Sequence, residues 1–133
     1  MSAPPSLPPY AAMLGLVREG NVLRMPYADR LIGSPGRLHG GSVAGLMEIA
    51  ANMAVMDALA GDPALVKPVN VTVDYLREGA LEDVFAEAIL MRMGRRVANV
   101  RVEAWQRERG RLIAAARMNL LIARQAGGAP PSA

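Results

Sequence analysis

The feature that most constrains this chain is the stretch from Gly41 to about Leu59, where Ala, Leu, Met and Val occupy most positions. It contains no Pro and only one internal Gly, and Gly61-Asp62-Pro63 ends it, so it predicts one long helix. Apolar side chains lie on nearly every face of that helix. This pattern is typical of a helix buried most of the way round, so the rest of the chain must wrap it.

Four strand candidates follow the helix and can supply this wrapping. Val69 to Tyr75 and Ala98 to Ala104 alternate apolar and polar residues, as half-buried strands do. Two further strands are expected at Val84 to Met93 and at Leu112 to Ile122. The segments between successive strands are as short as hairpin loops, which predicts antiparallel pairing of each strand with the next.

Before the long helix we expect a short helix at Tyr10 to Arg18, a short strand at Val22 to Tyr27 and a loop at Gly33 to Gly36. Together these elements predict an α+β fold in which an antiparallel five-stranded sheet wraps around one central helix. Residues 1–9 and 125–133 are rich in Pro, Gly and Ala and are expected to be flexible tails. One domain is expected at 10–124.

Composition limits the partners that we expect. The chain is 52% hydrophobic and has no Cys, so nothing points to an oxidising compartment and a cytoplasmic location is expected. Glu48, Asn52 and Asp57 interrupt the apolar stretch, so we expect no membrane span. The formal net charge is +3, and aromatic residues are few. The arginines are scattered except for two groups at predicted turns, Arg95–Arg96 and Arg107, Arg109 and Arg111. We therefore expect no nucleic-acid partner.

The residue types and motifs that the sequence lacks exclude several enzyme classes. Without Cys there is no thiol nucleophile, and with a single His there is no usual zinc site, so no metal is expected. The chain also lacks a G-x-S-x-G motif and a phosphate-binding P-loop motif.

His39, Gly40 and Gly41 precede the predicted helix and could carry chemistry. A helix N-terminus presents free backbone N–H groups, and glycine lets a carbonyl approach them closely, so the pair could form an oxyanion hole. A glycine pair is also common as a turn device. His39 could likewise cap the helix rather than transfer a proton, and the spacing alone leaves both readings open.

Glu48 lies seven residues after Gly41, about 10 Å along the helix and on nearly the same face. Burying an unpaired carboxylate is costly, so a Glu in so apolar a helix requires an explanation. In one reading Glu48, Asn52 and Gly45 form a thin solvent-facing stripe. In the other, Glu48 lies at a dry cleft and acts as a base or a nucleophile.

The segment L-H-G-G-S-V-A-G-L-M-E resembles the H-G-G-x-x-x-x-L-x-D/E signature of hotdog-fold acyl-CoA thioesterases of the phenylacetic-acid-degradation type. V-T-V-D-Y-L-R-E-G resembles that family's second-strand segment, and M-G-R-R-V-A-N-V-R-V-E-A-W resembles its hairpin. Order and spacing agree from about Val22 to Ile122. The resemblance implies a hotdog fold and hydrolysis of an acyl-CoA to the free acid and coenzyme A.

The resemblance also implies roles for individual residues. Glu48 would be the base or nucleophile, the backbone N–H of Gly40, with help from Gly41, would polarise the thioester carbonyl, and His39 would organise the turn. No separate cofactor is implied, because coenzyme A is part of the substrate. The family's sites lie between two subunits, which implies a homodimer or a homotetramer.

Three arginines, Arg77, Arg95 and Arg96, would hold the phosphates of coenzyme A according to the same resemblance. A guanidinium group matches phosphate geometry better than a point charge does.

Two positions depart from the family's pattern. Many members carry Asp in place of Glu48, and many carry Asn six residues before the His, where this chain has Gly33. Asn52 or Thr72 could supply the missing polar contact to the substrate. Two other functions on the same fold remain open, namely a non-catalytic acyl-CoA-binding protein and an acyl-thioester hydratase or dehydratase.

Overall fold

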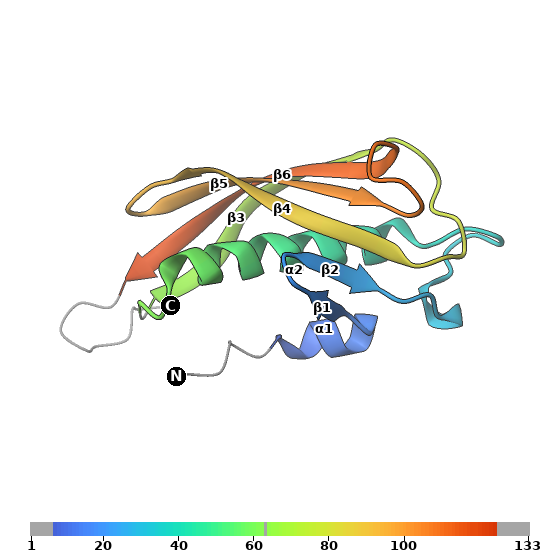
Figure 1. Cartoon of the computed structure of the whole chain (residues 1–133), viewed down its shortest axis with the longest axis horizontal. Helices are drawn as coiled ribbons and strands as arrows, with labels where there is room; N and C mark the ends of the chain where they lie inside the picture. Colours follow the sequence, from blue (N-terminus) through green and yellow to red (C-terminus); the bar gives the residue numbers. More distant parts are fainter. Residues whose placement is uncertain (1–6, 63, 125–133) are drawn as a thin grey trace.

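The computed structural model describes residues 7–62 and 64–124 (Figure 1). One long helix, α2 (Gly40–Leu59), packs against a six-stranded antiparallel sheet, which confirms the predicted α+β hotdog architecture. The predicted tails lie largely outside the described residues. The strands are β1 (Val17–Glu19), β2 (Val22–Met25), β3 (Ala64–Tyr75), β4 (Val84–Met93), β5 (Val97–Trp105) and β6 (Leu112–Arg124).

Helix α2 runs along one face of the curved sheet, as Figure 1 shows. Eleven of its 20 residues are buried, so the prediction of a helix buried most of the way round is confirmed. Its mean hydropathy of 1.3 and its length would also suit a membrane span, but 61% of that stretch is buried within the protein. It is the core helix around which the sheet is built.

Small residues on the sheet make room for this helix. Ala114 and Ala116 of β6 belong to the same buried cluster as Leu46 and Met47 of α2. Alanine has a weak intrinsic preference for strands. It is used here because packing against α2, rather than local propensity, decides which side chains fit on this face of the sheet.

The strand order is β1-β2-β4-β5-β6-β3, so the prediction that each strand pairs with the next is wrong for β3. β3 pairs along its length with β6, from Ala64 opposite Arg124 to Tyr75 opposite Ala114. The segment 76–83 is therefore a crossing connection to β4 rather than the hairpin turn expected at Arg77–Gly79. As a result, β3 lies at one edge of the sheet and β1 at the other.

The predicted count of five strands is also wrong, because the expected helix at Tyr10 to Arg18 is shorter than its pattern suggested. Helix α1 (Pro9–Leu14) ends at Gly15, whose φ of 73° places it in the left-handed conformation that terminates helices. The chain then turns into β1, which pairs with β2 and becomes the sixth strand.

A ladder of three asparagines joins β5, β6 and β3. Asn99 donates from Nδ2 to Oδ1 of Asn119, and Asn119 donates from Nδ2 to Oδ1 of Asn70 at 2.9 Å. The neighbours of Asn119 in the strand, Met118 and Leu120, point into the core, so the ladder lies on the face of the sheet away from α2. These bonds fix the register of the three strands.

The loop that leads into α2 leaves no room for a side chain at position 33. A Cβ atom on Gly33 would lie 2.8 Å from Cα of His39. Two backbone hydrogen bonds hold the segments in place, from Gly33 N–H to the carbonyl of Arg37 at 3.0 Å and from His39 N–H to the carbonyl of Leu31 at 2.8 Å. The loop packing therefore accounts for glycine at the position where the resembling family often has Asn.

We expect Gly33→Asn to lower the free energy of unfolding by about 1–3 kcal/mol, because the new Cβ must displace the His39 backbone. Gly110→Asn is the matched control, since a Cβ there meets nothing within 4 Å. Denaturant unfolding of both variants measures the difference. Equal stability of the two variants would contradict the packing argument.

Candidate active site

His39 caps the N-terminus of α2. Its Nδ1 accepts a hydrogen bond from the N–H of Gly41 at 2.8 Å, and its carbonyl accepts one from the hydroxyl of Ser42 at 2.7 Å. In this arrangement His39 holds the first turn of the helix through both its ring and its carbonyl.

The cap leaves the two glycines with different backbone N–H groups, one occupied and one available. The N–H of Gly41 is occupied by His39, whereas the N–H of Gly40 makes no hydrogen bond to any described residue. Gly40 also lines a cleft of about 380 Å³. Of the two glycines, Gly40 is therefore the one that can polarise an incoming carbonyl, and Gly41 can help only if the His39 ring turns away.

Tyr75, at the end of β3, is a site residue that the sequence did not reveal. Its hydroxyl donates to the carbonyl of Gly40 at 3.0 Å. Its ring lies so near the helix start that a Cβ on Gly40 would meet Cε1 of the ring at 3.2 Å. Alternation in the sequence placed Tyr75 at the end of a half-buried strand. Only the β3–β6 pairing brings that end of β3 over the helix start.

Glu48 projects from α2 between two buried neighbours, Met47 and Ile49. Its side chain is exposed in the single protomer and makes no ion pair or hydrogen bond within residues 7–62 and 64–124. Gly45 does not share this stripe, because it is buried under Tyr10 and Leu14 of α1. The carboxylate is thus an accessible acceptor about 12 Å along the helix from Gly40.

Asn52 lies one turn beyond Glu48 and lines a cleft of about 160 Å³ between α2 and the segment that begins at Leu7. Ile49, Met53 and Met56 give this cleft apolar walls. Oδ1 of Asn52 is buried without a hydrogen-bond partner in the described part of the chain. An orphaned acceptor of this kind costs about 1–3 kcal/mol unless a ligand or another chain supplies a donor.

Three of the predicted site residues lie away from Glu48 within one protomer. Thr72 pairs across the strands with Arg117 on the outer face of the sheet, so the sheet separates it from α2. Arg95 and Arg96 lie at the β4–β5 turn, toward the C-terminal end of α2 (Figure 1). Gly40 lies at the other end of the helix, about 30 Å away.

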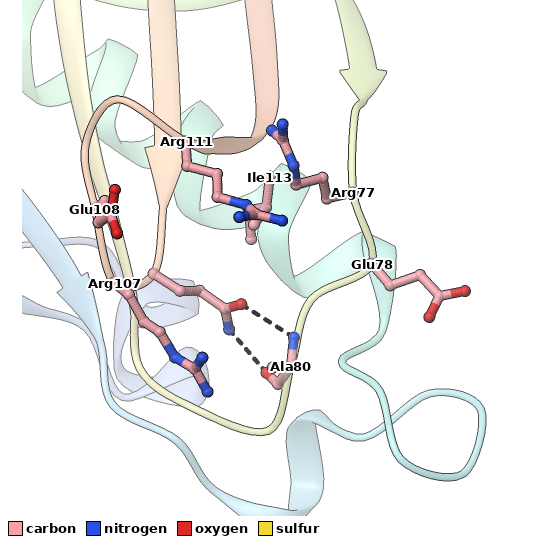
Figure 2. A pocket seen from close by; sticks show the side chains of 8 residues that line it. Arg77, Glu78, Ala80, Arg107, Glu108, Arg111 and Ile113 are labelled. Carbon is pink, nitrogen blue, oxygen red and sulfur yellow. Dashed lines mark hydrogen bonds between the residues drawn. The ribbon is translucent and has the colours of Figure 1, made fainter.

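Arg77, by contrast, lies at the same end of the molecule as Gly40. It lines the Gly40 cleft and a second cleft of about 340 Å³ under the β5–β6 turn (Figure 2). Arg107 and Arg111 also line this second cleft. The sequence groups Arg107 and Arg111 with Arg109 at one predicted turn, but nothing local shows that this turn faces the end of β3.

One of these arginines, Arg107, is held in an ion pair. Nε of Arg107 donates to Oε1 of Glu82 at 2.9 Å. This hydrogen bond lowers the pKa of Glu82 and raises the pKa of Arg107, so both groups remain charged and paired near neutral pH. Arg77 donates to a backbone carbonyl, that of Leu112, at 2.7 Å and keeps its full charge.

Comparison with known proteins identifies what this arrangement resembles. Residues 35–113 match the family model described as the thioesterase superfamily. AziG from S. sahachiroi has a similar structure, with a TM-score of 0.82 and 26% identity over 90% of this chain and 100% of that chain. A phenylacetic acid degradation-related protein from Ralstonia eutropha JMP134 gives a TM-score of 0.78 and 26% identity over 88% and 92% of the two chains.

A third similar structure is the BH2602 protein from Bacillus halodurans with CoA, with a TM-score of 0.77. It is 18% identical over 85% of this chain and 74% of that chain, which shows a common fold. No curated protein matches this chain in sequence.

The capping geometry makes a prediction about stability. His39→Ala removes the acceptor for the Gly41 N–H and should lower the free energy of unfolding by about 1 kcal/mol. His39→Asn should retain most of it, because Asn is among the best N-cap residues. Thermal or denaturant unfolding distinguishes the two variants. An equal loss in both would mean that ring packing, rather than the cap, explains the residue.

Proposed function

Because this chain belongs to the thioesterase superfamily, we propose that it hydrolyses an acyl-CoA thioester to the free acid and coenzyme A. The observation that supports this most is the free N–H of Gly40 at the start of the helix that carries the accessible carboxylate of Glu48. The similar fold that was solved with CoA supports coenzyme A as the ligand.

Gly40 would act first on the thioester carbonyl. Its N–H lies at the positive end of the α2 dipole and donates to the carbonyl oxygen, which becomes negatively charged as the carbon is attacked. Tyr75 supports this role because its hydroxyl donates to the Gly40 carbonyl. This bond holds the peptide group that follows the Gly40 N–H. His39 holds the next N–H group and prevents the first turn from unwinding.

Glu48 would supply the attacking group. The spacing of about 12 Å from Gly40, shortened by the lean of helical side chains toward the N-terminus, leaves room for a water between carboxylate and carbonyl. Glu48 takes a proton from this water, the oxygen bonds to the carbonyl carbon, and the C–S bond breaks to release the thiolate, which is then protonated.

The acyl group would extend along α2 from Glu48 toward Asn52. The cleft there has apolar walls from Ile49, Met53 and Met56, as an acyl chain or ring requires. Its volume of about 160 Å³ is close to that of a cavity that accommodates one benzene ring. We therefore expect short or single-ring acyl groups to be preferred over long chains.

The edge strand β3 supports a homodimer. Val69 is 61% exposed, Val71 45% and Leu65 43%, although all three lie in a strand of the main sheet. Among residues 7–62 and 64–124, no strand pairs with the backbone groups on the outer edge of β3. A second copy that adds its own β3 would cover these residues and extend the sheet.

We expect a solution mass of at least twice the 14.1 kDa chain mass at micromolar concentration, measured by sedimentation. Val69→Lys should dissociate the oligomer, because it places a charge on the proposed interface. Val17→Lys, on the opposite edge strand β1, is the matched control, since Val17 is 40% exposed and should leave the mass unchanged. A wild-type mass of a single chain would reject the dimer.

Glu48→Gln tests the proposed chemistry. Gln retains the volume but removes the base, so kcat for acyl-CoA hydrolysis should fall at least about 10²-fold. Because Glu48 is exposed and unpaired in the protomer, the thermal midpoint should hold. A thiol-reagent assay over a panel of acyl-CoA esters measures the rate.

Asp74→Asn, on the outer face of β3, is the control for a lost negative charge. If Glu48→Gln stays folded and hydrolyses thioesters at the wild-type rate, Glu48 is not the base. If the wild type binds acyl-CoA and hydrolyses none, the protein is a binding module.

A further inference from the structure

Two neighbouring clefts lie beside Arg77, and Arg77, Glu78 and Ile113 line both of them. The first also contains Gly40 and Tyr75, where the thioester carbonyl is proposed to sit. The second lies under the β5–β6 turn and contains Arg107, Arg111 and Glu108. We call the two clefts together the groove, because a long ligand with its thioester at Gly40 can reach the arginines of the second cleft.

Among the described residues, no carboxylate pairs with Arg77 or Arg111. Glu78 pairs with Arg37 at 2.8 Å, and Glu82 pairs with Arg107. The side chain of Glu108, which also lines the second cleft, makes no ion pair within the described part of the chain. Arg77 is bonded only to a backbone carbonyl, and the side chain of Arg111 makes no ion pair or hydrogen bond in the part of the chain that the structure describes. Two guanidinium groups are thus available to an anion.

The walls of this cleft are held in place. Oε1 of Gln106 accepts from the N–H of Ala80 at 3.0 Å, and its Nε2 donates to the carbonyl of Ala80 at 2.8 Å (Figure 2). This pair of bonds joins the 76–83 connection to the β5–β6 turn. In Figure 2 the Arg111 side chain extends toward Arg77, and its end overlaps Ile113 in this view. The arginines are therefore presented on two segments that are tied to each other.

We propose that this cleft binds the nucleotide end of the acyl-CoA, with Arg77 and Arg111 on its phosphate groups, and this proposal rests on the proposed function. Guanidinium groups bind phosphate in bidentate fashion, and two of them suit a ligand with several phosphates. The pantetheine arm lies along the shared wall at Arg77 and Ile113 and delivers the thioester to Gly40. This assignment adds Arg111 to the binding residues.

The assignment also places the phosphates differently from the Arg95–Arg96 pair. That pair lies at the β4–β5 turn, at the other end of β5 and about 30 Å from the β5–β6 turn. A ligand with its thioester at Gly40 of the same protomer reaches the Arg77–Arg111 cleft directly. The two locations can therefore be distinguished by mutation.

The experiment is calorimetric titration of the full-length protein with free coenzyme A, with pantetheine as the probe that lacks phosphates. Arg111→Gln is the cleanest variant, because the side chain makes no ion pair or hydrogen bond to any residue that the structure describes. Its Kd for coenzyme A should rise about tenfold or more, since charge-assisted hydrogen bonds to phosphate are lost. The Kd for pantetheine should not change.

Two further variants complete the test. Arg117→Gln, on the outer face of the sheet, removes the same charge away from the groove and should leave both Kd values unchanged. Gln106→Ala should weaken coenzyme A binding less than Arg111→Gln does, because it loosens the walls but keeps the arginines. The effect of Arg111→Gln should also shrink as salt is raised.

Three results would overturn the assignment. The first is no loss of coenzyme A binding in Arg111→Gln, and the second is an equal loss for coenzyme A and pantetheine. The third is a loss in an Arg95→Gln, Arg96→Gln double variant but not in Arg111→Gln. None of these results depends on hydrolysis. The nucleotide site can therefore be disproved while the catalytic role of Glu48 holds, and that role can be disproved while the nucleotide site holds.

Discussion

The burial of α2 against the sheet is the interaction on which the rest of the structure depends. A helix with 11 of its 20 residues buried cannot face water alone, so the strands must curve around it. Close approach of the strands then requires small residues such as Ala114 and Ala116 beneath the helix. Glu48 is an exposed carboxylate between buried neighbours on α2, so a ligand or a second protomer can reach it.

The positions of most helices and strands could be predicted from the local pattern of apolar and turn residues. The β4 bounds were predicted as Val84 to Met93 and are observed at those residues, because apolar runs and turn residues mark a strand whatever its partner. The neighbour of each strand could not be predicted in the same way. Alternation shows which face of a strand is buried but carries no information about its partner, so β3 was placed beside β4 when it lies beside β6.

The same limit applies to the candidate site: local spacing in the sequence identifies some of its residues, and only the strand order brings in the others. Gly40 and Glu48 were identified because both lie on one helix, where spacing in the sequence fixes spacing in space. Tyr75 comes from a strand that only the strand order brings to the helix start, so no motif could reveal its contact with Gly40. Likewise, only the strand order brings the turn that carries Arg111 beside Arg77. In the sequence, Gly33 stands where many members of the family carry Asn, so it was interpreted as the loss of a polar side chain. The tight approach to His39 gives it a steric reason.

The pairing of β3 with β6 also sets the order in which the protein can fold during synthesis. β3 and α2 are made early, but the strand that covers β3 extends to Arg124. Until then the ribosome-bound chain carries an apolar helix and an unpaired strand edge, both of which promote aggregation. Pairing of such distant segments is slow. Nascent chains of this protein should therefore depend on chaperones more than chains whose strands pair in sequence order.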